Sequence, residues 1–229
     1  NPIRIESQIL YNPNYSYSDF LIPSLACFGL LMSVLLVSVL LISSESTHNT
    51  YNELIEMAEG KASVVLLGKS LPHIALTILN SIITFGIFIG IFGININGSI
   101  FLSLLFLIFF LIVTLFLGLM ISSLFKDQMF ATELALFFVT PAFIFSGLTY
   151  PLWAMPEIHI LVAQVIPYTH FISGFLKISM MNAPLQFITK ETLVLLFFLF
   201  ITIVVSYTAI RFQIRKHSSA TKPFVSEEK

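Results

Sequence analysis

Charged residues are scarce in this sequence. Asp, Glu, Lys and Arg make up 10% of its 229 residues, whereas hydrophobic residues make up 57%. A soluble domain carries roughly a quarter charged residues, because its surface must be solvated. The mean hydropathy of +0.95 agrees with this shortage of charge. The composition therefore excludes an ordinary soluble domain and indicates a protein of the lipid bilayer.

Cysteine is almost absent, and the groups that metal or nucleophilic chemistry needs are not arranged for it. Cys27 is the only cysteine, which excludes an internal disulfide and a thiolate cluster. The histidines lack metal-ligand spacing, and no Ser/His/Asp or Cys/His set is present for nucleophilic catalysis. We expect no metal site and no enzyme activity on this chain. The net charge of −1 provides no basic surplus for nucleic acid.

What the sequence has instead is long apolar runs. A membrane-spanning helix needs about 20 apolar residues, and five runs meet this length. They cover residues 20–43, 71–94, 99–125, 129–149 and 192–210. A sixth candidate, 158–180, is interrupted by His159, Gln164, Pro167 and His170, so its apolar pieces are too short to cross. The sequence predicts an all-α membrane protein with five transmembrane helices and a transmembrane domain over 20–210.

The positions of Lys and Arg favour five spans over six. With five spans, eight basic residues lie on one side of the membrane and three on the other; with six, the count is six to five. The first side holds Lys61, Lys69, Lys126, Arg211, Arg215, Lys216, Lys222 and Lys229, and the second Arg4, Lys177 and Lys190. Because cytoplasmic segments carry the positive excess, residues 211–229 form a cytoplasmic tail. We expect a multi-pass protein of the cell membrane, specifically a bacterial inner membrane.

This topology places residues 1–19 outside the cell. The chain begins at Asn1 rather than Met, and residues 1–19 contain no apolar signal region. An external N-terminal segment therefore requires an earlier span. We expect the sequence to be part of a longer protein, with 1–19 as the end of an external domain.

A polar stretch, residues 45–61, separates the first two runs. Its apolar residues recur at helical spacing, at Tyr51, Leu54, Ile55, Ala58, Ala62 and Val65. Thr50 and Glu53 have the spacing of a capping box, which predicts a helix start. The polar face is acidic, so a basic protein surface suits it better than anionic lipid. The pattern predicts an amphipathic helix on the cytoplasmic surface; the alternative is a solvated connection that merely joins two spans.

Three polar residues in the apolar runs are candidates for a transport path. Asn80 and Thr84 would be penalised by lipid if unpaired, so they should face protein or a wet cavity. Glu133 is the one carboxylate at membrane depth, where ionisable groups are functional candidates. The alternative for Glu133 is that it reaches the membrane surface or pairs with Lys126.

The region after the fourth run is apolar but broken by prolines. Residues 140–171 contain four prolines and Trp153, the only tryptophan. Irregular backbone at membrane depth needs protein or water around it. We therefore predict a re-entrant external helical hairpin at 150–180, with Tyr150 and Trp153 as anchors at the interface. The alternative is an amphipathic external loop.

Gly68-Lys69-Ser70 ends like a phosphate-binding loop, but Ser63 stands where that motif needs glycine. The chain therefore lacks a nucleotide-binding motif of its own.

A spaced proline pattern is the most informative motif. It is made by Pro141, Ser146-Gly147, Pro151, Met155-Pro156, Pro167 and Thr169. With Tyr11 to Pro13 and "GKSLP" at 68–72, this order resembles the permease subunits of type 2 ATP-binding-cassette (ABC) exporters over nearly the whole chain.

The resemblance implies the C-terminal five-span portion of a six-span permease. Two permease subunits, identical or different, would form the translocation path, and separate nucleotide-binding ATPase subunits would bind ATP and Mg, leaving no cofactor on this chain. The helix at 45–61 resembles a coupling helix, which would contact the ATPase through Glu45, Thr50, Glu53 and Leu54. Pro151, Trp153, Met155 and Pro156 would help to close the outer end of the path.

The chain departs from the family pattern at three places, with Asn49 in place of glycine, Asn52 in place of an acidic residue, and Met57-Ala58 in place of the usual Thr-Pro after the helix. Rival functions for this topology are a membrane assembly protein, a membrane enzyme or a channel. An ATPase gene beside this one would favour export over these rivals.

Overall fold

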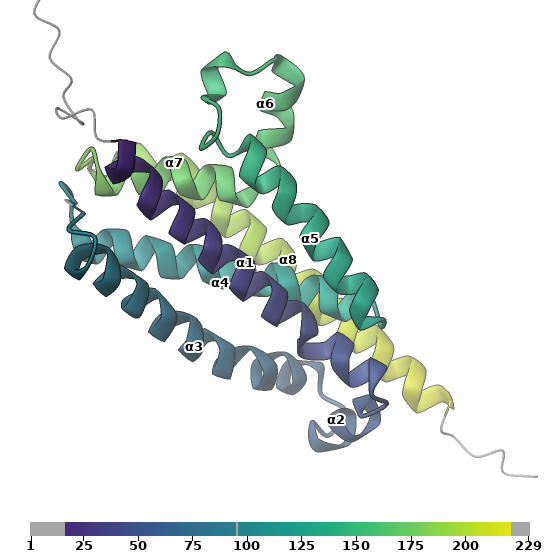
Figure 1. Ribbon diagram of the computed structural model, residues 1–229. Helices are drawn as coiled ribbons and strands as arrows, with labels where there is room; N and C mark the ends of the chain where they lie inside the picture. The colour runs from purple at the N-terminus through teal and green to yellow at the C-terminus, as the bar shows by residue number, and fades with distance from the viewer. Residues whose placement is uncertain (1–16, 95, 221–229) are drawn as a thin grey trace, which may run out of the picture. The chain divides into compact units, whose positions relative to one another are not determined.

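A computed structural model of the chain describes residues 17–94 and 96–220. These residues form helices, and no strand occurs among them. Five helices are long and apolar enough to cross a membrane (Figure 1): α1 (Tyr17–Thr47), α3 (Ala62–Gly90), α4 (Ile100–Leu124), α5 (Gln128–Phe145) and α8 (Thr189–Ala220). The predicted all-α membrane fold with five spanning helices is confirmed. Residues 1–16 of the expected external segment and 221–229 of the tail lie outside the described residues.

Shorter helices occupy the connections. The first is α2 (Tyr51–Met57), between α1 and α3. The region predicted as an external hairpin contains η1 (Leu152–Ala154), α6 (Glu157–Gln164) and α7 (Pro167–Ser179), and η2 (Leu185–Ile188) follows. The axes of α6 and α7 differ by 87°. The pair is therefore bent sharply and does not form one straight helix.

Several helix boundaries differ from those of the predicted runs, and three of the differences have a clear structural description. α3 begins at Ala62 rather than at residue 71, because the polar residues Lys69 and Ser70 find partners within the helix or on α1. α5 ends at Phe145 rather than at residue 149, shortly before Gly147, whose φ of 88° is incompatible with a continuing helix. α8 continues beyond residue 210 to Ala220, so the described part of the tail is helical.

The chain divides into two compact units. Unit 1 contains the described residues up to Met32, together with Ile78–Leu111 and Val139–Leu196. Unit 2 contains Ser33–Thr77, Ile112–Phe138 and the described residues from Phe197 onward. Each of the five long helices contributes one segment to each unit.

The core of unit 1 is built around α7. Tyr168, Phe171 and Phe175 are fully buried, and the ring of Phe171 stacks on that of Phe110 with centroids 4.1 Å apart. Tyr168 also donates a hydrogen bond to the carbonyl of Ser24, at 2.8 Å. Buried tyrosine hydroxyls normally find such a partner. This aromatic cluster makes α7 the central element of the unit rather than a peripheral loop helix.

An ion pair joins α7 to the first turn of α8 in unit 1. Lys177 Nζ lies 2.5 Å from Glu191 Oε1, and the hydroxyl of Ser173 donates to the same oxygen at 3.2 Å. Glu191 is buried. A buried carboxylate is tolerated when it is paired in this way, so the contact fixes the start of α8 against α7.

The loop before α4 closes the end of α7. The backbone N–H of Gly98 donates to the carbonyl of Ser179 at 3.0 Å, and the Asn97 side chain donates to the carbonyl of Met180 at 3.3 Å. The last carbonyls of a helix have no partner within the helix, and these two donors supply one. The approach is so close that a Cβ atom at Gly98 would lie 1.8 Å from the carbonyl oxygen of Ile178.

In unit 2, α1 and α4 approach each other through small residues. A Cβ atom at Gly118 would lie 1.9 Å from Ser38 Oγ and 3.0 Å from the carbonyl oxygen of Leu35. One turn further along α4, Ser122 Oγ accepts hydrogen bonds from the backbone N–H groups of Ile42 and Ser43, at 2.8 and 2.9 Å. Small residues that bring two backbones together are typical of helix contacts in membranes.

Candidate functional site

The short helix α2 in unit 2 is preceded by a turn that stops α1. Asn49 has a φ of 62°, which is the left-handed conformation that asparagine tolerates better than other non-glycine residues. The N–H of Thr50 donates to the carbonyl of Glu45 at 3.0 Å, and that of Asn49 to Ser46 at 3.4 Å. This is the Schellman pattern of helix termination. Asn49, which replaces glycine in the family pattern, therefore keeps the backbone conformation that glycine would provide.

A second turn of the same kind ends α2. Glu59 has a φ of 52° and Gly60 a φ of 68°. The N–H of Gly60 donates to the carbonyl of Ile55, and that of Glu59 to Glu56, both at 3.0 Å. The helix is thus bounded by a left-handed turn at each end, and it forms a separate element between α1 and α3 (Figure 1).

The predicted capping box is not present. Thr50 is the N-cap residue of α2, but its side chain makes no capping hydrogen bond. Its hydroxyl donates instead to the carboxylate of Glu45, and the other carboxylate oxygen of Glu45 pairs with Lys69 Nζ at 2.5 Å. Glu45 therefore belongs to the end of α1, not to α2. It ties α1 to α3 through its pair with Lys69.

The exposed face of α2 is acidic and carries one large apolar side chain. Glu53, Glu56 and Met57 are exposed, and Met57 is 76% exposed. Leu54 is half-buried, and Ile55 is buried. Of the predicted contact residues on this helix, Glu53 lies on the open face and Leu54 on the packed side. Glu56 belongs to the predicted acidic face, but neither it nor Met57 was predicted as a contact residue, although the three- and four-residue spacing from Glu53 places both on the same face.

Removing the Glu45–Lys69 pair is expected to destabilise unit 2. Their side chains are 23% and 24% exposed, so the charges are partly shielded from water. A double-mutant cycle with Glu45→Gln and Lys69→Met should give a coupling free energy of about 1 kcal/mol in thermal unfolding of the purified protein. Lys61 and Glu59 form a matched pair at the same 2.5 Å, but with 61% and 75% exposed side chains. Their cycle should give a coupling near zero; equal couplings would show that shielding has no effect here.

The candidate residues of the outer end lie around η1 in unit 1. Trp153 is 87% exposed, whereas Met155 is buried. Pro151 and Pro156 are exposed, and each precedes a helix, η1 and α6 respectively. Proline fits these positions because its fixed φ suits the start of a helix and its missing N–H is not needed there. An exposed tryptophan on an apolar segment is typical of the membrane interface.

The candidate path residues are divided between the two units. In unit 1, Asn80 is exposed and Thr84 is half-buried on α3. In unit 2, Glu133 is exposed on α5. Within the described residues, no ion pair joins Glu133 to Lys126. No group of His, Cys, Asp and Glu in the described part of the chain could hold a metal ion.

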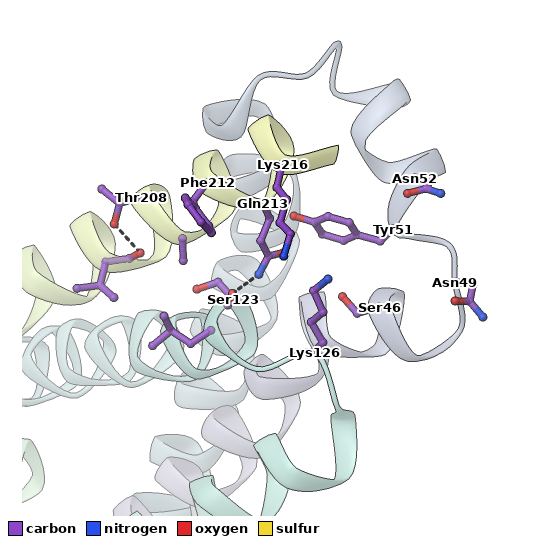
Figure 2. A pocket seen from close by; sticks show the side chains of 13 residues that line it. Ser46, Asn49, Tyr51, Asn52, Ser123, Lys126, Thr208, Phe212, Gln213 and Lys216 are labelled. Carbon is purple, nitrogen blue, oxygen red and sulfur yellow. Dashed lines mark hydrogen bonds between the residues drawn. The ribbon is translucent and has the colours of Figure 1, made fainter. Parts of the chain in front are cut away.

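Unit 2 also contains a pocket of about 840 Å³ behind α2 (Figure 2). The residues that line it are Ser46, Asn49, Tyr51, Asn52, Ser123, Leu124, Lys126, Val205, Thr208, Ala209, Phe212, Gln213 and Lys216. Figure 2 shows the polar ends of Tyr51 and Lys126 directed toward Gln213 and Lys216 of α8. Sequence reasoning did not find this pocket, because three segments distant in the chain contribute to it.

Comparison with known families agrees with this architecture. Residues 5–180 match the family described as ABC-2 type transporter. The chain belongs to the ABC-2 type transporter family. The resemblance found in the spaced prolines is thereby confirmed, and this ABC-2 chain is a multi-pass membrane protein.

Several individual proteins are similar to this ABC-2 chain. ABC transporter G family member 20 of Dictyostelium discoideum is 29% identical over 173 residues, which cover 74% of this chain and 23% of that protein. The probable multidrug ABC transporter permeases YbhR and YbhS of Escherichia coli are 26% and 25% identical, over 78% and 75% of this chain and 48% and 45% of their own. The ABC-2 chain thus spans about half or less of the length of these relatives.

Proposed function

We propose that this chain is the membrane-spanning permease subunit of an ATP-driven exporter. It forms the translocation path with a second permease subunit and is coupled to separate ATPase subunits, which hold ATP and Mg and carry out the hydrolysis. The observation that carries the proposal is α2, a separate helix between two membrane-spanning helices with an open acidic face. Membership of the ABC-2 family supports it.

The chemistry of α2 suits contact with a protein. Glu53 and Glu56 present two carboxylates beside the exposed Met57. An exposed apolar side chain flanked by negative charges is complementary to a partner surface that has an apolar pocket surrounded by basic residues. ATP-driven closure of the ATPase subunits would press on this face and thereby alternate the access of the path.

The remaining candidate residues take positions along the path. Asn80 and Thr84 of unit 1 and Glu133 of unit 2 would line it, and the η1 region with Trp153 would help to close its outer end. By the positive-inside rule, Arg211 and the other basic residues at the end of α8 support a cytoplasmic location for that end. The proposed location is a bacterial inner membrane, and two of the similar proteins come from a bacterium, Escherichia coli.

Charge reversal on α2 is expected to uncouple this permease from its ATPase subunit. In the full-length permease reconstituted with its ATPase, Glu53→Arg together with Glu56→Arg should reduce copurification of the ATPase and permease-dependent ATP hydrolysis at least about tenfold, because like charges would then face each other across the contact. ATP hydrolysis by the ATPase alone is the baseline.

A matched control is Glu157→Arg, which reverses another exposed carboxylate, on α6 in unit 1. It should leave ATP hydrolysis unchanged. Partial rescue by Arg→Glu or Lys→Glu changes on the ATPase would locate the basic residues of the partner surface. Full ATP hydrolysis and normal copurification of the α2 variant would refute the coupling role.

A further inference from the structure

The pocket of unit 2 has a polar end and an apolar wall. Its polar end combines the end of α1 and the start of α2, the end of α4 with the connection that follows it, and the last turns of α8. Leu124, Val205 and Phe212 form the apolar wall. This combination occurs where a membrane-spanning helix leaves the hydrocarbon region, and a molecule with both a polar head and an apolar chain suits it.

The charge of the pocket has one sign. Lys126 and Lys216 are its only ionisable residues apart from Tyr51, and no Asp or Glu occurs among its lining residues. Asn52 of α2 also lies in the wall, and its side chain is polar but uncharged. The acidic residues of α2, such as Glu53, are not in the wall. The pocket therefore favours an anion.

Two buried polar atoms at the pocket lack partners among the described residues. They are the hydroxyl of Tyr51 and the side-chain oxygen of Gln213. Gln213 uses its amide nitrogen to donate to the carbonyl of Ser123, at 2.6 Å, which fixes its oxygen as a free acceptor. Burial raises the pKa of Tyr51 to about 12, so at neutral pH this hydroxyl is a donor. A buried polar atom without a partner costs free energy, which a ligand with both an acceptor and a donor would recover.

We propose that this pocket binds the headgroup of an anionic phospholipid of the phosphatidylglycerol type, with one acyl chain along the apolar wall. The phosphate accepts from Lys126, Lys216 and Tyr51, and a headgroup hydroxyl donates to the oxygen of Gln213. Basic pockets between membrane helices commonly hold such headgroups. The apolar wall is the reason for choosing a lipid over soluble phosphate as the source of the anion.

The test measures lipid retained by the purified full-length protein. The protein is reconstituted in nanodiscs of phosphatidylcholine with a minor fraction of phosphatidylglycerol, extracted in mild detergent and weighed by native mass spectrometry. One phosphatidylglycerol should remain bound in preference to phosphatidylcholine. Lys126→Gln with Lys216→Gln should reduce this retention at least about tenfold, because two charge-assisted contacts are lost. Since no ATPase is present, the result is independent of the proposed coupling.

Controls separate the pocket from general surface charge. Lys61→Gln with Arg211→Gln removes two exposed charges that are outside the pocket, and it should change retention less than about twofold. Asn52→Glu, which adds a negative charge to the wall without removing a lysine, should also reduce retention if the double lysine variant fails to fold.

The remaining outcomes would overturn the assignment. Equal losses in the pocket variant and the surface variant would mean that retention reflects net charge alone. Displacement of phosphatidylglycerol by excess inorganic phosphate, with no dependence on the Phe212→Ser change in the apolar wall, would identify soluble phosphate as the ligand. Equal retention of phosphatidylcholine would exclude an anion site.

Discussion

Gly98→Ala should lower the free energy of unfolding by about 3 kcal/mol or more, because it places a methyl group against backbone. The nearest atom to the new Cβ would be the carbonyl oxygen of Ile178 at 1.8 Å, followed by the carbonyl carbon at 3.0 Å. Neither belongs to a side chain that could rotate away. The loop must move, and the hydrogen bond from Gly98 N–H to Ser179 is lost with it. Thermal unfolding of the purified protein, followed by size-exclusion chromatography, measures the loss.

The matched control for this change is Gly86→Ala. Gly86 lies within α3 in the same unit, and a Cβ atom there would meet nothing within 4 Å. Alanine is the better helix former, so this variant should be as stable as the parent or more stable by up to about 1 kcal/mol. If both variants unfold at the parent temperature, the loop does not hold α7 in the way described.

Gly118→Ala should destabilise unit 2 by about 2 to 3 kcal/mol, the usual upper range for overpacking. The new Cβ would contact Ser38 Oγ at 1.9 Å and Ser38 Cβ at 2.8 Å, and both atoms lie on a short side chain. Even if the hydroxyl rotates, the Cβ of Ser38 and the carbonyl oxygen of Leu35, at 3.0 Å, stay in place. α1 and α4 must separate, which also lengthens the contacts of Ser122 with α1. The midpoint of thermal unfolding measures this effect.

A second substitution tests the cause. Ser38→Gly removes both Ser38 atoms from the collision, so the double variant Ser38→Gly/Gly118→Ala should recover part of the lost stability. Gly68→Ala, in α3 of the same unit with nothing within 4 Å of its Cβ, should have no adverse effect. A double variant no more stable than Gly118→Ala alone would show that the contact with Ser38 is not the source of the loss.

The membrane-spanning helices could be predicted from sequence because their length is set by the bilayer. Apolar runs of about 20 residues were enough to identify five of them. Their ends were less predictable, since a polar residue at a helix end is tolerated once it finds a partner. Lys69 illustrates this point: it marked the end of an apolar run, yet it lies inside α3 because Glu45 pairs with it.

The core of unit 1 could not be predicted in the same way. Tyr168, Phe171 and Phe175 are buried in protein, whereas Phe137 and Phe200 are exposed at 70% and 66%. In a membrane protein, apolar side chains face both lipid and protein, so hydrophobicity alone does not separate a core residue from a surface one. Periodicity is informative for α2 because one of its faces is polar.

The candidate site was predicted only in part from the sequence. The acidic face of α2 was visible in the helical spacing of Glu53 and Glu56. The hydroxyl of Thr50, however, donates to the carboxylate of Glu45, lies within reach of its carbonyl oxygen, and accepts no capping bond from an N–H group of α2. The contact with Glu45 depends on where α1 ends, which is set by the left-handed turn at Asn49. The lysines of the pocket come from α8 and from the connection between α4 and α5, and their proximity depends on the fold of unit 2.

The two turns around α2 have a mechanical consequence. Three residues, 48–50, separate α1 from α2, and four, 58–61, separate α2 from α3. The backbone N–H of every one of these seven residues donates to a backbone carbonyl. These short, hydrogen-bonded connections therefore cannot extend when α2 moves relative to α1 and α3. Any displacement of α2 must therefore also move the adjoining ends of α1 and α3.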